Sequence, residues 1–309
     1  MQHVPVLLNQ VVDALAIEAN DTLIDGTYGR GGHAQALLAC LGENGRLLVV
    51  DQDPQAIAHA KAGIGQDERV TVRQANFSQL GQIVEELGWS GEINGVLLDL
   101  GVSSPQLDEG ERGFSFMLDG PLDMRMNTEA GQSAAEWLAE VDESTLAAVI
   151  KDYGEERHAR RIAQAIVKAR ADTPIETTGQ LARVVASVSR GRPGHHPATR
   201  TFQAIRIFIN RELDVLDQWL ANFFQHLAPG GRMAVISFHS LEDRRVKQAW
   251  HALAKPPQAS RRDPVAIDFQ PTLKLVGKPI VADEAECQAN PRARSARLRV
   301  AERVMAEAA

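Results

Sequence analysis

A glycine-dense segment between two short apolar runs places the strongest constraint on how this chain folds. The first run, residues 23–24, ends at Asp25, and the second, residues 47–50, ends at Asp51. Between them, apolar side chains recur at helical spacing over residues 34–41. This order predicts a strand, a loop, a helix and a second strand, which is the βαβ unit of an open α/β sheet.

The loop of this unit has the features of a nucleoside-binding site. Its glycines, among them Gly31 and Gly32, let a ligand approach the backbone because no Cβ stands in the way. The free N–H groups at the start of the following helix point toward an anionic group of the ligand. Asp51 lies nineteen residues after Gly32, where a carboxylate can accept hydrogen bonds from both ribose hydroxyls. The segment therefore predicts a site for an adenosine-type nucleoside.

Two ligand classes use this geometry, and Asp25 separates them. The dinucleotide fingerprint can be placed on Gly29, Gly31 and Ala34, but its first glycine normally follows the strand directly. Here Asp25 ends the strand and Gly29 lies four residues later. An acidic residue before the glycines suits S-adenosylmethionine (AdoMet), whose methionine part carries an ammonium group and no pyrophosphate. AdoMet is thus the favoured cofactor, NAD is the alternative, and a tight turn without a ligand is the third interpretation.

The composition is that of a soluble protein of a reducing compartment. A length of 309 residues predicts about two domains, and 44% apolar residues are enough for a large core. No apolar run approaches the ~20 residues that cross a bilayer, and the N-terminus lacks a basic flank and a cleavage site. Cys40 and Cys287 show neither metal spacing nor a disulfide framework. We therefore expect a cytoplasmic protein with no membrane partner.

The charge distribution is uneven along the chain. The net charge of −7 by itself argues against a nucleic-acid partner. However, residues 1–110 hold 15 acidic and 5 basic side chains, whereas residues 151–262 hold 10 acidic and 19 basic ones. An acidic cofactor half joined to a basic half suits an enzyme that binds a polyanion with part of its surface. Solvated helix faces account for some of these charges.

A second informative stretch follows the continuous apolar run 93–98, which is typical of a strand buried on both faces. The run ends at Asp99, and Ser-Ser-Pro follows at residues 103–105. Amino-group methyltransferases carry a D/N/S-P-P-aromatic loop at this place, which holds the target nitrogen. Gln106 stands where an aromatic residue is expected, so the match is partial, and a simple Ser/Pro turn is the alternative. Phe77, after the alternating strand 69–73, could cover an adenine ring or belong to the core.

Helical periodicity continues without a strand pattern from Ser133 to about residue 188, and Ser133 with Glu136 fits a capping box. We interpret this region as an all-helical domain inserted into the sheet. The inserted domain is placed at residues 111–205, and residues 1–110 and 206–309 form the α/β domain.

Basic residues gather where these helices are interrupted. The segment 189–201 contains two glycines and two prolines, and it is a candidate phosphate-binding loop. Its basic side chains are those of Arg190, Arg192, His195, His196 and Arg200. No carboxylate or cysteine lies at ligand spacing from the histidines, so we expect no metal site.

The remaining chain predicts the end of the sheet. One long helix is expected over residues 202–227, ended by Pro229-Gly230-Gly231, followed by a fifth strand at 233–238. His239, Ser240 and Asp243 invite comparison with a hydrolase triad, but no G-x-S-x-G elbow exists. Ser240 with Asp243 three residues later fits a helix cap instead. His239 remains a candidate because it lies just past a strand end. Two closing strands are expected near residues 273–280 and 295–304.

Seven blocks of this sequence resemble, in order and from end to end, the RsmH (MraW) family. The blocks are HVPVLLN, DGTYGRGGH, DLGVSSPQLD, RGFSF, GPLDMRM, HPATRTFQAIRIFIN and ISFHSLEDR. The resemblance implies a class I AdoMet-dependent methyltransferase fold, Rossmann-like, with an inserted helical domain that recognises RNA. It also implies methylation of N4 of a cytidine in the decoding centre of 16S ribosomal RNA, with the small ribosomal subunit as partner. AdoMet contacts are implied for Gly31, Gly32, His33, Asp51, Phe77, Asp99 and Gln106.

The implied chemistry is direct in-line methyl transfer to the exocyclic amine. Hydrogen-bond acceptors that take the amine protons would localise its lone pair, and no covalent enzyme intermediate is needed. The candidate catalytic residues are Ser103, Ser104, Pro105 and His239. The base must be unpaired or flipped outward to reach them, with Phe114 and Phe116 as candidate stacking partners.

Two rival functions remain at this point: an NAD-dependent oxidoreductase, and a non-catalytic RNA-binding ribosome assembly factor. The oligomeric state is open between a monomer and a homodimer.

Overall fold

The computed structural model describes residues 5–190, 196–256 and 269–305. The chain divides into two compact units, one of residues 1–101 with 213–309 and the other of residues 102–212. The chain therefore leaves the first unit once, after Gly101, and returns to it once, at Leu213. The predicted insertion, residues 111–205, falls within the second unit.

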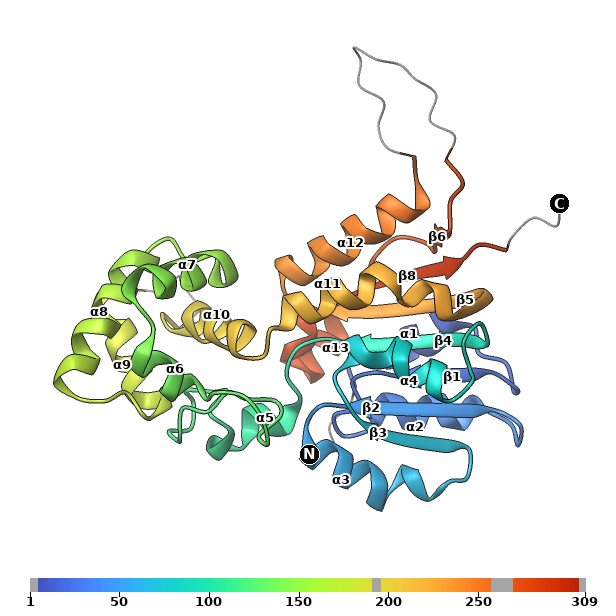
Figure 1. Cartoon of the computed structure of the whole chain (residues 1–309), viewed down its shortest axis with the longest axis horizontal. Helices are drawn as coiled ribbons and strands as arrows, with labels where there is room; N and C mark the ends of the chain where they lie inside the picture. The colour runs from blue at the N-terminus through green and yellow to red at the C-terminus, as the bar shows by residue number, and fades with distance from the viewer. Residues whose placement is uncertain (1–4, 191–195, 257–268, 306–309) are drawn as a thin grey trace, which may run out of the picture. The chain divides into compact units, whose positions relative to one another are not determined.

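The first unit is built on one open sheet with the strand order β3-β2-β1-β4-β5-β8-β6, and β7 pairs with β8 (Figure 1). Strands β1 to β5 are parallel to one another, whereas β8 is antiparallel to β5, β6 and β7. The carboxyl ends of β1, β2, β4 and β5 thus meet at one edge. The strands are β1 (Thr22–Asp25), β2 (Arg46–Asp51), β3 (Val70–Gln74), β4 (Ile93–Asp99), β5 (Leu227–Ser237), β6 (Leu273–Leu275), β7 (Ile280–Val281) and β8 (Arg297–Arg303).

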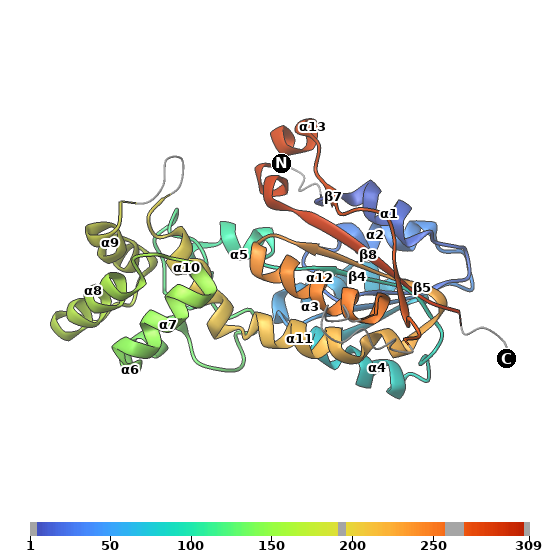
Figure 2. The ribbon, with the colours of Figure 1, turned by 90° about the horizontal axis from the view of Figure 1, so that it is seen from above.

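Helices cover both faces of this sheet, which explains why its central strands are apolar throughout. One face packs on α4 (Leu80–Glu86), α11 (Glu212–Asn222) and α12 (Ser240–Ala254). The other packs on α1 (Leu8–Leu15), α2 (Gly32–Cys40) and α3 (Pro54–Ala62). Figure 2 shows α4 and α11 on one side of the strands and α1 and α2 on the other. Short helices complete the unit: η1 (Ile64–Gln66), η2 (Phe77–Gln79), η4 (Phe223–His226), α13 (Glu284–Ala289) and η5 (Pro291–Ser295).

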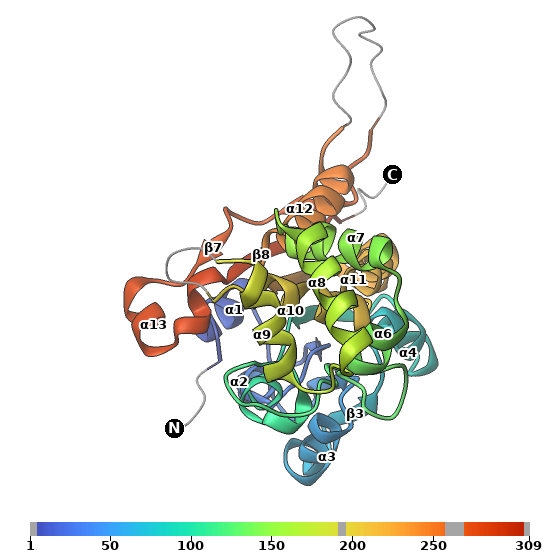
Figure 3. The ribbon, with the colours of Figure 1, turned by 90° about the vertical axis from the view of Figure 1, so that its left-hand side faces the viewer.

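The second unit is helical, as predicted. Five helices surround one apolar core (Figure 3) that includes Trp137, Leu146, Ile162, Leu181 and Phe202. They are α6 (Ala134–Glu140), α7 (Glu143–Gly154), α8 (Ala159–Asp172), α9 (Thr178–Val188) and α10 (Thr199–Ile209), and α5 (Ser104–Asp108) and η3 (Gly110–Arg112) precede them.

The capping box predicted at the start of α6 is present. The Ser133 backbone N–H donates to Glu136 Oε2 at 2.8 Å, and the Glu136 N–H donates to Ser133 Oγ at 3.2 Å. Each side chain thus satisfies a backbone donor that the first helical turn leaves without a partner.

The single long helix expected at residues 202–227 was wrong. The chain is helical as α10 and again as α11, but Arg211 between them has a left-handed φ of 50°. The Asn210 side chain bonds to backbone groups of residues 124 and 126, which holds the chain away from helical continuation.

The fifth strand expected at residues 233–238 begins earlier, because Pro229, Gly230 and Gly231, which were expected to end the preceding helix, lie inside β5. The β4–β5 register shifts between Ile93 and Gly95. A Cβ on Gly231 would lie 2.5 Å from the Ile93 carbonyl oxygen, so glycine permits this close approach of the two strands.

No helix in the described parts of the chain combines the length and the apolar character that crossing a bilayer requires.

Candidate active site

The glycine-rich loop after β1 has the conformation that its sequence requires. Gly29 and Gly31 have φ values of 56° and 77°, in the left-handed region that favours glycine. A Cβ on Gly31 would lie 2.5 Å from the Tyr28 hydroxyl, and one on Gly32 would collide with the Pro5 ring. The loop thus needs these glycines for its internal packing. The sequence alone had explained them only by the close approach of a ligand.

Asp51, at the end of β2, is bonded to the glycine-rich loop. Its Oδ2 accepts the Gly29 N–H at 2.8 Å, and its Oδ1 accepts the Asp53 N–H at 2.9 Å. Burial raises the pKa of Asp51 to about 6, although these N–H groups favour the ionised form and oppose the shift. The bonds fix the carboxyl group where the second strand leaves the sheet.

Asp25, at the end of β1, is almost fully buried, with 1% of its surface exposed. One oxygen accepts the Thr27 N–H at 3.1 Å, and Oδ2 has no hydrogen-bond partner among the described residues. Burial raises the pKa of Asp25 to about 7, and the nearby Asp51 adds to the shift. A buried carboxyl oxygen without a partner is costly in a folded protein, so it points to a ligand that would satisfy it.

Asp99, at the end of β4, is the third carboxyl group at this edge. Burial raises its pKa well above the ordinary value, and the charges of Asp25 and Glu242 act in the same direction. Its backbone N–H donates to Thr27 Oγ1 at 2.6 Å. Its Oδ1 finds no hydrogen-bond partner in the part of the chain that the structure describes.

His33, in the first turn of α2, lies between the N-terminal segment and Asp99. Its Nε2 is 3.0 Å from the Val6 carbonyl oxygen, which only accepts hydrogen bonds, so Nε2 carries a proton. Its Nδ1 lies 3.7 Å from Asp99 Oδ2. The sequence indicated no partner for either nitrogen, because Val6 and Asp99 reach His33 only through the tertiary fold.

The carboxyl groups at this edge fit a cationic ligand, with Asp25 buried and Asp51 and Asp99 half-buried. Each has a raised pKa because an ionised carboxylate is poorly solvated there, and a nearby positive charge would restore the ionised form. AdoMet carries two positive groups, the sulfonium and the ammonium. The pyrophosphate of NAD would instead bring negative charge toward Asp25 and Asp99. The residues at this edge therefore fit AdoMet and disfavour a dinucleotide.

His239 follows β5, and it caps α12 together with Glu242. The Glu242 N–H donates to His239 Nδ1 at 3.4 Å, and Glu242 Oε2 accepts the Phe238 N–H at 2.8 Å. The cap predicted from Ser240 and Asp243 was wrong, because Asp243 instead pairs with Arg299 at 2.7 Å. The buried Glu242 was missed, although its position three residues after the cap was a usable signal.

The remaining predicted site residues differ in burial. Phe77 begins η2, is half-buried and packs against the core on the α4 face of the sheet. In the helical unit, Ser103, Ser104 and Pro105 are half-buried at the start of α5, and Gln106 is buried. Gln106 Oε1 accepts the Ser103 N–H at 2.9 Å, which is one half of a capping box. The Ser-x-x-Gln spacing was a signal for this bond.

The predicted stacking and phosphate-binding residues lie in the helical unit. Phe114 is buried, so its ring faces cannot receive a base without rearrangement. Phe116 stacks on the exposed His196, with ring centroids 4.4 Å apart. Arg190 is exposed and Arg200 half-buried, whereas Arg192 and His195 lie outside the described residues.

Strand order and site chemistry together define the class of this protein. Its β8 lies antiparallel between β5 and β6, whereas the dinucleotide-binding sheet has six parallel strands, so the NAD alternative is set aside. The sheet, with acidic residues at the ends of β1, β2 and β4, is that of a class I AdoMet-dependent methyltransferase, and AdoMet is its cofactor.

Comparison with known proteins identifies the family. The sequence profile of the MraW methylase family matches residues 1–304. The chain belongs to this family, which confirms the resemblance found in its sequence.

Two relatives illustrate the similarity. The ribosomal RNA small subunit methyltransferase H of Xanthomonas oryzae pv. oryzae (strain KACC10331 / KXO85) is 56% identical over 303 residues, which cover 98% of this chain and 89% of that protein. The protein of the same name from Stenotrophomonas maltophilia (strain K279a) is 54% identical over 310 residues, covering 99% and 94%. Among solved structures, an rRNA methylase from Streptococcus thermophilus covers 99% of both chains at 13% identity, with a TM-score of 0.42.

Proposed function

We propose that this methyltransferase transfers the methyl group of AdoMet to N4 of a cytidine in the decoding centre of 16S ribosomal RNA. The methyl donor is supported by the carboxyl groups of Asp25, Asp51 and Asp99, whose pKa values are all raised at one edge of the sheet, and this is the observation that carries the proposal. The RNA substrate is supported by the family and by the names of the relatives.

The cofactor-binding roles follow from the chemistry of each predicted residue. Asp51 would accept hydrogen bonds from the ribose hydroxyls, and Phe77 would cover the adenine ring. Gly31, Gly32 and His33, at the start of α2, would contact the methionine part. Asp99 would face the positive groups of AdoMet, and Gln106 would contribute from α5. When bound, AdoMet supplies an electrophilic methyl group on its sulfonium.

The start of α5 suits an amine substrate better than an anion. The N-terminus of a helix ordinarily presents free N–H donors, which repel the N–H groups of an amine. Here the Ser103 N–H is bonded to Gln106, and Pro105 has no N–H. Two donors are therefore removed from this helix end. The oxygens of Ser103 and Ser104 would accept the N4 protons and localise the nitrogen lone pair for attack.

His239 would assist as a hydrogen-bond acceptor or a proton acceptor. Its ring is oriented by Glu242, whose Oε1 lies 3.2 Å from His239 Nε2. A buried carboxylate at this distance restricts rotation of the imidazole ring.

The decisive experiment is methyl transfer from labelled AdoMet to small ribosomal subunits from cells that lack this enzyme. We expect one methyl group per subunit, identified after digestion by mass spectrometry as N4-methylcytidine. A methyl group on cytosine C5 or on a ribose hydroxyl would overturn the N4 assignment. Subunit binding without methyl transfer would instead favour the non-catalytic assembly factor.

A further inference from the structure

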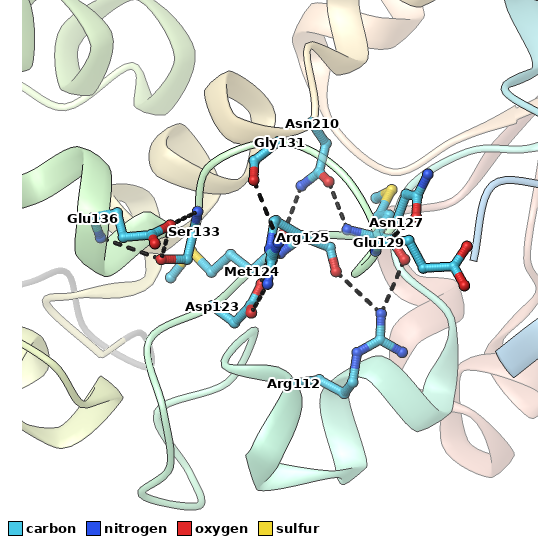
Figure 4. Close-up of polar contacts among 11 residues, drawn as sticks. Arg112, Asp123, Met124, Arg125, Asn127, Glu129, Gly131, Ser133, Glu136 and Asn210 are labelled. Carbon is cyan, nitrogen blue, oxygen red and sulfur yellow. Dashed lines mark hydrogen bonds and ion pairs between the residues drawn. The ribbon is translucent and has the colours of Figure 1, made fainter. Parts of the chain in front are cut away.

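A polar cluster in the helical unit lies close in sequence to both points where the chain passes between the two units. The chain enters the helical unit at Val102 and leaves it after Glu212. Arg112 lies ten residues after the entry, and Asn210 lies two residues before the exit. Both side chains bind the backbone of the same loop, residues 124–126 (Figure 4). We call Arg112, Asn210 and this loop backbone the crossing cluster.

Arg112 contributes a buried cation to the crossing cluster. Only 5% of its surface is exposed, and its Nη2 lies 3.1 Å from the carbonyl oxygens of Arg125 and Met126. Its own carbonyl oxygen accepts the Met124 N–H at 3.1 Å. Burying a guanidinium group is expensive, and such groups persist where their hydrogen bonds specify one arrangement. The arginine thus fixes η3 against the loop.

Asn210, which follows α10, also forms hydrogen bonds with the backbone of residues 124–126. Its Oδ1 accepts the Met126 N–H at 2.7 Å, and its Nδ2 donates to the Met124 carbonyl oxygen at 2.8 Å. Met124 has a left-handed φ of 62°, which is unfavourable for a methionine and is held by these bonds. Asn210 therefore joins the end of α10 to Met124 and Met126, two of the three residues that Arg112 binds.

The crossing cluster connects directly to α5. The Arg112 N–H donates to the Glu109 carbonyl oxygen at 3.0 Å, and the Glu109 N–H donates to the Pro105 carbonyl oxygen at 2.8 Å. A continuous path of backbone hydrogen bonds thus runs from the crossing cluster to the helix that carries Ser104 and Pro105. A shift of η3 would be transmitted to that helix.

We propose that Arg112 and Asn210 are positioning residues, which act through the backbone of residues 124–126 to hold α5 in the arrangement that methyl transfer requires. This inference rests on the proposed function, because it assumes that α5 holds the substrate amine. If Arg112 and Asn210 only stabilised the helical unit, replacing them would lower the stability of that unit. Turnover by the folded protein would then stay unchanged.

The test compares three single variants and one double variant with the wild type. They are Asn210→Ala, Asn210→Asp, Arg112→Lys, and Arg112→Lys combined with Asn210→Ala. For each, kcat and KM for methylation of small ribosomal subunits, the Kd of AdoMet and the unfolding midpoint are measured. Asp142→Ala is the matched control, because Asp142 accepts the Thr145 N–H at 2.9 Å and caps α7 in the same unit.

We expect Asn210→Ala to lower kcat by about ten- to a hundredfold, since small misplacements of a positioning element are that costly. The Kd of AdoMet should change far less than kcat, because the predicted ribose and methionine contacts lie in the other unit and α5 carries only Gln106 of the predicted cofactor contacts. Asn210→Asp keeps the oxygen that accepts the Met126 N–H but cannot donate to the Met124 carbonyl oxygen. Its kcat should therefore fall less than that of Asn210→Ala. The double variant should be no slower than the slower single variant, since both act on one loop.

Asp142→Ala should lower the unfolding midpoint and leave kcat within about twofold, because a helix cap acts on stability alone. The inference is overturned if folded variants of Arg112 and Asn210 keep the wild-type kcat, or if the control loses as much kcat as they do. It also fails if the losses of the two single variants simply add. If the wild-type protein itself transferred no methyl group, the proposed function would be wrong. That result differs from the outcomes that contradict only the positioning role.

Discussion

Three carboxyl groups at the edge of the sheet decide the chemistry of this protein at the scale of single residues. Asp25 and Asp51 have pKa values raised to about 7 and about 6, and that of Asp99 is raised well above its ordinary value, in each case chiefly by burial. Such shifts favour the neutral acids until a cation arrives. The same residues therefore cost stability in the free protein and provide affinity in the complex.

Asp51→Ala tests the ribose assignment. The variant loses two acceptor oxygens, and a charge-assisted hydrogen bond contributes about 1.5–3 kcal/mol, so AdoMet affinity should fall at least about tenfold by calorimetry. Asp53→Ala is the matched control, because Asp53 caps α3 by accepting the Gln55 N–H at 2.9 Å. It should leave the affinity nearly unchanged. Unchanged affinity in Asp51→Ala would remove the ribose role.

Ser104→Ala tests the substrate loop. The variant removes one hydroxyl acceptor at the start of α5 and keeps the backbone, so turnover should fall by roughly ten- to a hundredfold. AdoMet affinity should not change. The measurements are kcat with small ribosomal subunits and calorimetry with AdoMet alone. Wild-type turnover would show that this hydroxyl takes no part in catalysis.

At the scale of elements, helix ends carry much of the site. The pair His239 and Glu242 begins α12, as Ser103 and Gln106 begin α5. The sequence predicted a cap at the start of α12 but assigned it to Ser240 and Asp243. The spacing of His239 and Glu242 was a usable signal for the actual pair, whereas the partners of Asp243, which are Arg297 and Arg299 of β8, lie more than fifty residues away in sequence.

A comparison of Glu242→Ala with Ser240→Ala tests the cap of α12. Glu242→Ala leaves the Phe238 and His239 N–H groups without their acceptor, so the free energy of unfolding should fall by about 1–3 kcal/mol. Ser240→Ala should change it by less than about 0.5 kcal/mol, as is usual for an exposed position. Both values come from denaturant unfolding. Equal losses would favour the Ser240 cap.

At the scale of the whole molecule, the acidic groups couple stability to pH. Their folded-state pKa values lie above the ordinary value near 3.8. The stability they contribute is therefore complete below about pH 4, decreases as pH rises, and is lost by about pH 7, at up to about 1.4 kcal/mol per pH unit for each group. AdoMet is a cation, so its binding would favour the ionised carboxyl groups and would reduce the loss of stability at high pH.

We accordingly expect AdoMet to raise the unfolding midpoint more at pH 8 than at pH 6. Binding at pH 6 should also release protons, and binding at pH 8 should release few, because the acids are then already ionised. Calorimetry in two buffers of different ionisation enthalpy measures this release. Asp25→Asn should reduce the proton release at pH 6. Proton uptake, or no release, would contradict the site as described.

The sequence by itself determined the βαβ unit, the apolar central strands, the inserted helices and the acidic ends of β1, β2 and β4. Those features depend on local periodicity and on residues at the ends of elements, which neighbouring residues encode. Only the tertiary structure decided the break between α10 and α11, the continuation of β5 through Gly231, and the partners of His33 and Asp243. Each of these depends on atoms that folding brings together, such as the Ile93 carbonyl beside Gly231 and Asp99 beside His33. Such distant contacts outweigh the weak local preferences on which a sequence-based prediction relies.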